Sequence, residues 1–249
     1  MKYYRITQYN PAFRNAEGAY LYDHWTEIGD VGRTLEGELV TADKYLAVES
    51  DYIQAVAAIL KENSLEYLRV VGCNPKRIKH WINKYKDEWF HLPEFETIEL
   101  QEDKKARIDE IRTICQMNLR GYCNISLEIS GVFYVDFGYD MYMYVGAPHI
   151  SDALRKKLDA TSVFVEDSGE PYYPEKPNYE VLKSKKRSKY VLEEQVREDF
   201  SVEDVRKILN LSDEHPGKVH AKINRKMAQE LNLETDFEKY DYVLTSQGN

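Results

Sequence analysis

The chain has little cysteine, and its thiols are scattered. Cys73, Cys115 and Cys123 are the three cysteines among 249 residues. They are too few and too irregularly spaced for a disulfide framework, and an odd count is typical of buried thiols. No histidine follows Cys115 or Cys123 at the spacing that zinc ligands need. We therefore expect no metal site, and no other pattern indicates a cofactor.

A long apolar run is also missing. A transmembrane helix needs roughly 18 or more consecutive apolar residues, and no stretch of the sequence approaches that length. Residues 1–6 alternate polar and apolar side chains, without the apolar segment and small-residue cleavage site of a signal peptide. The sequence therefore predicts a cytoplasmic protein without a membrane segment.

Catalytic signatures are the third absence. The sequence contains no nucleophile elbow, no phosphate-binding loop, no kinase motif set and no pair of histidines at metal-ligand spacing. His24 lies in a glycine-bearing loop together with Asp23, Glu27 and Asp30, but a lone histidine near carboxylates is weak evidence for catalysis. These absences favour a protein that is not an enzyme, and they do not exclude a site assembled from distant residues.

Positive charge is in deficit. The formal net charge is −9, with 34 Lys and Arg against 43 Asp and Glu. Nucleic-acid binding over the whole surface is disfavoured, because phosphate contacts need clustered cations. An excess of carboxylates has two interpretations: it keeps a protein in solution, or it forms an acidic face that meets a basic partner.

Tyrosine, by contrast, is abundant. The chain has 20 Tyr against 8 Phe and 3 Trp. A tyrosine ring can be buried while its hydroxyl finds a partner, and tyrosine is enriched at protein interfaces for that reason. The alternative interpretation is a tyrosine-rich, half-buried sheet.

The pattern of apolar residues predicts an α+β fold: a mixed or antiparallel sheet with helices packed on one face, plus a small helical C-terminal segment. Apolar residues recur at steps of three and four from residue 45 to 60, and Thr41 is a good cap for this helix. Ser151 is expected to cap a further short helix that contains Leu154 and Leu158. Residues 123–145 read as a β-hairpin that turns at Ser130-Gly131.

Composition also divides the chain. Residues 1–166 are predicted as an α+β core domain. Three prolines and then a run of lysines indicate a Pro/Lys-rich linker over 167–190. Ser201 resembles the start of a helix with a capping box, so 191–249 is predicted as a helical C-terminal segment.

The most informative stretch is residues 132–145, which reads as one long aromatic strand interrupted by Gly138. Phe133, Val135 and Phe137 are expected to face the core. Asp136 and Asp140, four residues apart on a strand, would lie on the order of 13 Å apart, too far to share a proton or a metal ion. The opposite face is therefore a candidate protein-binding surface rather than a catalytic site. It consists of Tyr134, Asp136, Asp140, Tyr142 and Tyr144.

Two basic segments are candidates for nucleic-acid contact. The stronger one lies in the predicted linker and consists of Lys183, Lys185, Lys186, Arg187 and Lys189. Lys218, Lys222, Arg225 and Lys226 form a weaker cluster after it. Residues 76–92 interleave basic and aromatic side chains, a pattern that can bind nucleic acid. The favoured interpretation is a surface helix whose aromatic side chains face the core.

The acidic, tyrosine-rich and motif-poor composition resembles that of bacterial immunity and inhibitor proteins, which neutralise basic toxin enzymes. The resemblance covers composition and general layout, and no motif carries it. It implies a non-catalytic protein-binding module, an immunity-type inhibitor of a basic bacterial toxin. The alternative is a nucleic-acid-associated protein that contacts phosphate through its C-terminal basic segment.

Overall fold

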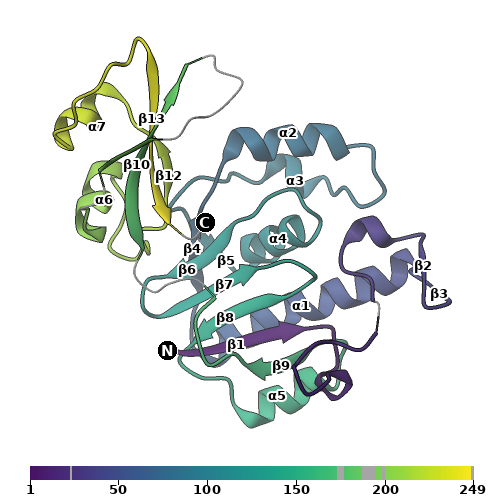
Figure 1. Ribbon diagram of the computed structural model, residues 1–249. Helices are drawn as coiled ribbons and strands as arrows, with labels where there is room; N and C mark the ends of the chain where they lie inside the picture. The colour runs from purple at the N-terminus through teal and green to yellow at the C-terminus, as the bar shows by residue number, and fades with distance from the viewer. Residues whose placement is uncertain (23, 173–176, 187–193, 198–199, 248–249) are drawn as a thin grey trace. The chain divides into compact units, whose positions relative to one another are not determined.

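The computed structural model of the chain describes residues 1–22, 24–172, 177–186, 194–197 and 200–247. The chain divides into two compact units, Met1–Tyr172 and Tyr173–Asn249. The predicted α+β class is confirmed, since antiparallel sheets and helices occur together (Figure 1). None of the helices among the described residues combines the length and the apolar character that crossing a membrane would require.

A seven-stranded antiparallel sheet forms the centre of the first unit. Its order is β5-β4-β6-β7-β8-β1-β9. The strands are β1 (Lys2–Thr7), β4 (Tyr67–Val71), β5 (Lys105–Arg107), β6 (Ser126–Ile129), β7 (Phe133–Phe137), β8 (Met143–Ala147) and β9 (Phe164–Asp167). Every pairing between neighbours is antiparallel.

Helices cover one face of this sheet, with α1 in contact with both α4 and α5 (Figure 1). The helices are α1 (Ala42–Glu62), α2 (Pro75–Tyr85), α3 (Glu94–Thr97), α4 (Ile108–Leu119) and α5 (Asp152–Asp159). Two short 3-10 turns, η1 (Pro11–Phe13) and η2 (Ile28–Asp30), and the small hairpin of β2 (Thr34–Leu35) and β3 (Glu38–Leu39) lie between β1 and α1.

The core of the first unit lies between the sheet and these helices. Its sheet side is seen in one row of residues that face one another across five strands: Val70, Leu127, Val135, Val145 and Tyr4. All five are buried. Alternation along each strand directs this row to the helices and sends its neighbours to the other face of the sheet.

A buried ion pair joins the helices. The Arg120 guanidinium donates two hydrogen bonds to the Glu49 carboxylate, at 2.7 and 2.6 Å, and a third to the Phe90 carbonyl at 2.6 Å. Both side chains are almost fully buried. Because α1 supplies Glu49 and the end of α4 leads into Arg120, this contact fixes the two helices and the chain that follows α2.

Several predicted helix starts are confirmed. Thr41 Oγ1 accepts a hydrogen bond from the Lys44 amide at 3.2 Å, and the helix that it caps continues to Glu62. Ser151 caps α5 in the same way, and Ser201 forms a capping box with Asp204. These signals are local, which is why the sequence contains them.

The predicted single strand through residue 145 is wrong. Strand β7 ends at Phe137, the chain turns over residues 138–142, and β8 runs back beside β7. Asp140 and Met141 both have φ of 57°, in the left-handed region, and the Gly138 amide donates to the Tyr142 carbonyl at 2.8 Å. A Cβ at Gly138 would lie 2.8 Å from the Tyr144 ring, so glycine is needed where the ring packs on the turn.

The second unit has its own sheet and core. Its antiparallel strands follow the order β11-β10-β13-β12. The strands are β10 (Asn178–Lys185), β11 (Glu194–Arg197), β12 (His220–Lys222) and β13 (Tyr240–Gln247), and the helices are α6 (Val202–Leu209) and α7 (Arg225–Glu230). Tyr179, Val181, Val205 and Leu244 are among its buried residues.

This organisation differs from the composition-based division at 166 and 190. Strand β10 lies inside the segment predicted as a linker, and strands accompany the two helices of the C-terminal segment. The reason is that Tyr179 and Val181 alternate with polar neighbours, a strand signal of only a few residues beside many prolines and lysines. Only part of the predicted linker lies in the described residues.

Candidate functional site

The five residues predicted as a protein-binding surface do not share one exposed surface. Tyr134 is 5% exposed and Asp136 is 3% exposed. The Tyr134 hydroxyl accepts a hydrogen bond from the Tyr172 amide at 3.2 Å, and the Ser126 hydroxyl donates to the Asp136 carboxylate. Burial raises the pKa of Tyr134 to about 12. These two side chains belong to the interior of the first unit.

The other three members lie nearer the surface. Tyr144 pairs with Asp136 across the hairpin, and its ring stacks on that of Tyr172 at 3.8 Å between centroids. Asp140 is exposed in the turn between β7 and β8, and Tyr142 is half-buried. The hairpin therefore brings Asp136 and Tyr144 together, whereas Asp140 lies at the far end of the turn.

Tyr142 connects this hairpin to a second region. Its ring meets the Tyr9 ring edge-on at 5.4 Å between centroids, and the Tyr9 hydroxyl donates to the Asp140 carbonyl at 2.8 Å. Tyr9 in turn contacts Tyr20 at 5.0 Å and His24 at 5.5 Å. A chain of rings thus runs from the hairpin to the loop between β1 and α1.

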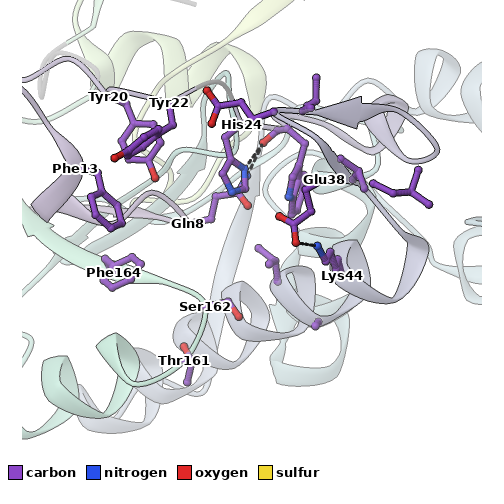
Figure 2. Close-up of a pocket in the computed structure, with 17 residues that line it drawn as sticks. Gln8, Phe13, Tyr20, Tyr22, His24, Glu38, Lys44, Thr161, Ser162 and Phe164 are labelled. Carbon is purple, nitrogen blue, oxygen red and sulfur yellow. Dashed lines mark hydrogen bonds and ion pairs between the residues drawn. The ribbon is translucent and has the colours of Figure 1, made fainter.

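That loop borders a cleft of about 540 Å³ (Figure 2). Its walls come from the loop after β1, from the β2–β3 hairpin, from the first turns of α1 and from the start of β9. Gly18, Gly32 and Gly37 have positive φ in the loop, so each permits a turn that residues with a side chain rarely adopt. We call this the aromatic cleft.

Exposed rings line one side of the aromatic cleft. Phe13 is 43% exposed and Tyr22 is 49% exposed. The two rings meet edge-on at 5.4 Å, and Tyr20 meets Tyr22 at 6.0 Å. Figure 2 shows Phe13, Tyr20 and Tyr22 gathered together, with Phe164 below them. Large exposed apolar groups around a concavity are typical of a binding surface.

Two carboxylates also line the cleft. Glu36 and Glu38 both line it and are exposed, and Glu38 forms an ion pair with Lys44 (Figure 2). The hydrogen bond from Lys44 lowers the pKa of Glu38, so this carboxylate is ionised at neutral pH. A basic side chain of a partner would therefore exchange with Lys44 at this carboxylate.

Gln8 supplies a polar atom deeper in the same cleft. The residue is 8% exposed, and its Nε2 donates to the Trp25 carbonyl at 2.8 Å. That bond fixes the orientation of the amide, so the other atom is the acceptor Oε1. No donor in the described part of the chain reaches this oxygen. A buried acceptor in a lined cleft is suited to a donor from a ligand.

The carboxylates near His24 have structural roles. Asp30 accepts hydrogen bonds from the Thr26 amide at 2.9 Å and from Arg33 at 2.8 Å, and it is buried at the turn η2. His24 Nδ1 lies 3.3 Å from the Trp25 carbonyl. Asp23 lies outside the described residues. Nowhere in the described ranges do three or more His, Cys, Asp or Glu side chains come together as a metal site.

The predicted nucleic-acid contacts occupy the second unit. Lys183 lies over the Tyr240 ring at 4.9 Å, and Lys186 donates to the Phe237 carbonyl. Lys185 is exposed on β10. Arg187 and Lys189 lie outside the described residues.

The weaker C-terminal cluster is largely neutralised by carboxylates. Lys222 pairs with Asp241 at 2.7 Å, Arg225 with Glu238 at 3.1 Å and Lys226 with Glu230 at 3.7 Å. Lys218 is 9% exposed. These cations are less available to phosphate than their number in the sequence indicates.

Comparison with protein-family models, with curated proteins and with solved structures finds no match. The sequence patterns did not predict the aromatic cleft, although they place His24 in its glycine-bearing loop. One signal was present: Phe13, Tyr20 and Tyr22 stand among turn-forming residues, where large rings have no local structural role.

Proposed function

We propose that this chain is a non-catalytic protein-binding module that holds a basic side chain of its partner in the aromatic cleft. One observation carries the proposal: exposed aromatic rings and the ionised Glu38 carboxylate line one concavity. A cation over an aromatic face is attracted by the ring quadrupole, and carboxylates add charge-assisted hydrogen bonds. The amide oxygen of Gln8 offers a further acceptor.

The charge of the first unit supports the same kind of partner. Residues 1–172 hold 20 Lys and Arg against 28 Asp and Glu, a net charge of −8, whereas residues 173–249 hold 14 against 15. An acidic unit speeds the approach of a basic protein and suppresses acidic partners. We extend the proposal to an immunity-type inhibitor whose partner is a basic bacterial toxin, as the compositional resemblance implies.

The direct test uses short peptides with Arg, Lys or Gln at one central position, titrated into the full chain by calorimetry. We expect Arg and Lys peptides to bind about tenfold more tightly than the Gln peptide, the size of one desolvated cation–π contact. Tyr22→Ala and Glu38→Gln should each remove this preference. Tyr139→Ala is the matched control, because Tyr139 is 88% exposed and does not line the cleft. Equal binding of all three peptides would overturn the proposal.

The inhibitor role has its own test. A toxic basic protein encoded by a neighbouring gene is co-expressed with this chain in a bacterial host. We expect the native chain to restore growth of the host and the Tyr22→Ala variant not to restore it. Growth restored equally by both chains would show that inhibition does not depend on the aromatic cleft.

The alternative function, phosphate contact through the C-terminal basic segment, has less support in the described residues. Three of its cations have carboxylate partners, and two others lie against a ring or a carbonyl. Truncation of residues 183–249 followed by a salt-titrated binding assay tests it, since loss of a salt-dependent signal on truncation is what it predicts.

A further inference from the structure

The helix α2 carries a basic surface that the proposed function does not use. Residues 75–86 hold five Lys and Arg and no Asp or Glu, whereas the rest of residues 1–172 hold 15 Lys and Arg against 28 Asp and Glu. The five cations are Lys76, Arg77, Lys79, Lys84 and Lys86, and all are exposed. We call them the α2 basic face. The first carboxylates after them, Asp87 and Glu88, come once the helix has ended.

The helical period separates this face from an apolar one. Ile78, Trp81, Ile82 and Tyr85 recur at steps of three and four and pack against the core of the unit. Because the apolar side is already covered, α2 has no free apolar stripe to insert into a lipid surface. Only its charged side is available, so its contacts must be electrostatic.

The cations of this face are not neutralised within the described chain. Lys76, Arg77, Lys79 and Lys86 form no ion pair among the described residues. Lys84 lies over the rings of Trp81 at 4.5 Å and Tyr85 at 4.9 Å. Clustered like charges repel one another, so a surface of this kind gains most from a polyanion.

An exposed indole follows the basic face. Trp89 is 49% exposed, three residues after Lys86, and meets Phe90 edge-on at 5.6 Å. The Phe90 carbonyl is bound by the buried Arg120, which holds this part of the chain in place. A fixed, exposed ring beside a row of cations is the combination on which the bases of a single strand stack while the cations follow its phosphates.

We propose that the α2 basic face binds the phosphate backbone of single-stranded nucleic acid, with Trp89 as a stacking platform for a base. A helix of 11 residues is about 16 Å long, enough for a few consecutive phosphates. The site is separate from the aromatic cleft and from the C-terminal basic segment, since none of its residues belongs to either. An acidic protein segment is the competing ligand. Its carboxylates could pair with the cations, but it has no base to stack on the exposed indole of Trp89.

The test measures binding of a fluorescent single-stranded oligonucleotide to the full chain across a salt series. The triple variant Lys76→Gln, Arg77→Gln, Lys79→Gln should bind at least about tenfold more weakly and reduce the salt slope by about 2, at roughly 0.7 for each lost phosphate contact. The matched control is Lys222→Gln, Arg225→Gln, Lys226→Gln, which makes the same charge change at paired cations. It should bind like the native chain.

Two further arms decide the kind of polyanion. Trp89→Ala should weaken single-strand binding about fivefold or more, the effect of one lost stacking contact, with little change of the salt slope. A duplex of the same sequence should bind more weakly than the single strand. Equal losses in both triple variants, an unaffected Trp89→Ala variant, tighter duplex binding, or equally strong competition by polyglutamate would each overturn the proposal. Far-ultraviolet circular dichroism confirms that the variants remain folded.

Discussion

The hairpin β7–β8 and the aromatic cleft use the same kinds of residue in opposite ways. In the hairpin, Tyr134 and Asp136 are buried and bound to Tyr172 and Ser126. In the cleft, Tyr22 and Glu38 are exposed, and the concavity between them is open to a ligand. Composition alone does not distinguish these regions, since both are rich in tyrosine and carboxylate. Burial and local partners decide which one stabilises the fold and which one is available for binding.

The largest expected effect concerns the buried ring of the hairpin. Tyr134→Ala should lower the free energy of unfolding of the first unit by about 3–5 kcal/mol, the usual cost of deleting a buried aromatic side chain. Denaturant unfolding followed by tryptophan fluorescence measures it, because Trp25, Trp81 and Trp89 are all in this unit. Tyr139→Ala is the control. A loss below about 1 kcal/mol would mean that Tyr134 is not part of the core.

The next effect concerns the two aspartates that the sequence placed on one face. Asp136→Asn should destabilise the first unit by about 1–3 kcal/mol, because it changes a buried hydrogen-bonded group. Asp140→Asn should change stability by less than about 0.5 kcal/mol, since the side chain is exposed and asparagine also tolerates a left-handed backbone. The same unfolding assay compares them, and equal losses would remove the contrast between the two positions.

High pH should distinguish the two regions more finely. The pKa of Tyr134 is raised to about 12 by burial, above the value of about 10 for an unfolded chain. Its contribution to stability is therefore complete below pH 10 and is lost as the pH rises through 12. The free energy of unfolding should fall over that range in the native chain and fall less steeply in Tyr134→Phe. An equal slope in the two proteins would contradict the assignment.

The smallest effect on stability is expected in the cleft. Tyr22→Ala should leave the free energy of unfolding within about 0.5 kcal/mol of the native value, since half of the side chain is already in water. Its effect should appear in the peptide titration instead. A clearly lower free energy of unfolding would show that the ring of Tyr22 stabilises the loop instead of being available to bind a ligand.

Local signals account for what the sequence predicted well. Helix α1 and the caps at Thr41, Ser151 and Ser201 depend on residues within a few positions of one another. The hairpin at Ser130-Gly131 also formed as predicted, because its turn and its alternation are adjacent in the sequence.

The missed features depend on contacts that are distant in sequence. The chain reverses at residues 138–142 because Tyr9 and Tyr52 bind the carbonyls of Asp140 and Met141, and neither partner is near the turn in the sequence. The apolar alternation has the same parity on both sides of Gly138, so it could not indicate a reversal. The cleft likewise needs the loop after β1, the helix α1 and the strand β9 to meet, which no short motif specifies.

Tyr9 links the aromatic cleft to the turn between β7 and β8. One end of its ring meets Tyr20 and His24 beside the aromatic cleft, while its hydroxyl holds the turn that bears Tyr139 at its tip. A ligand that displaces the rings of the cleft is therefore expected to shift Tyr9 or to lengthen the hydrogen bond from its hydroxyl to the Asp140 carbonyl. A reporter dye attached at position 139, which is exposed and does not line the cleft, should then sense occupancy through a shift of the turn that bears it.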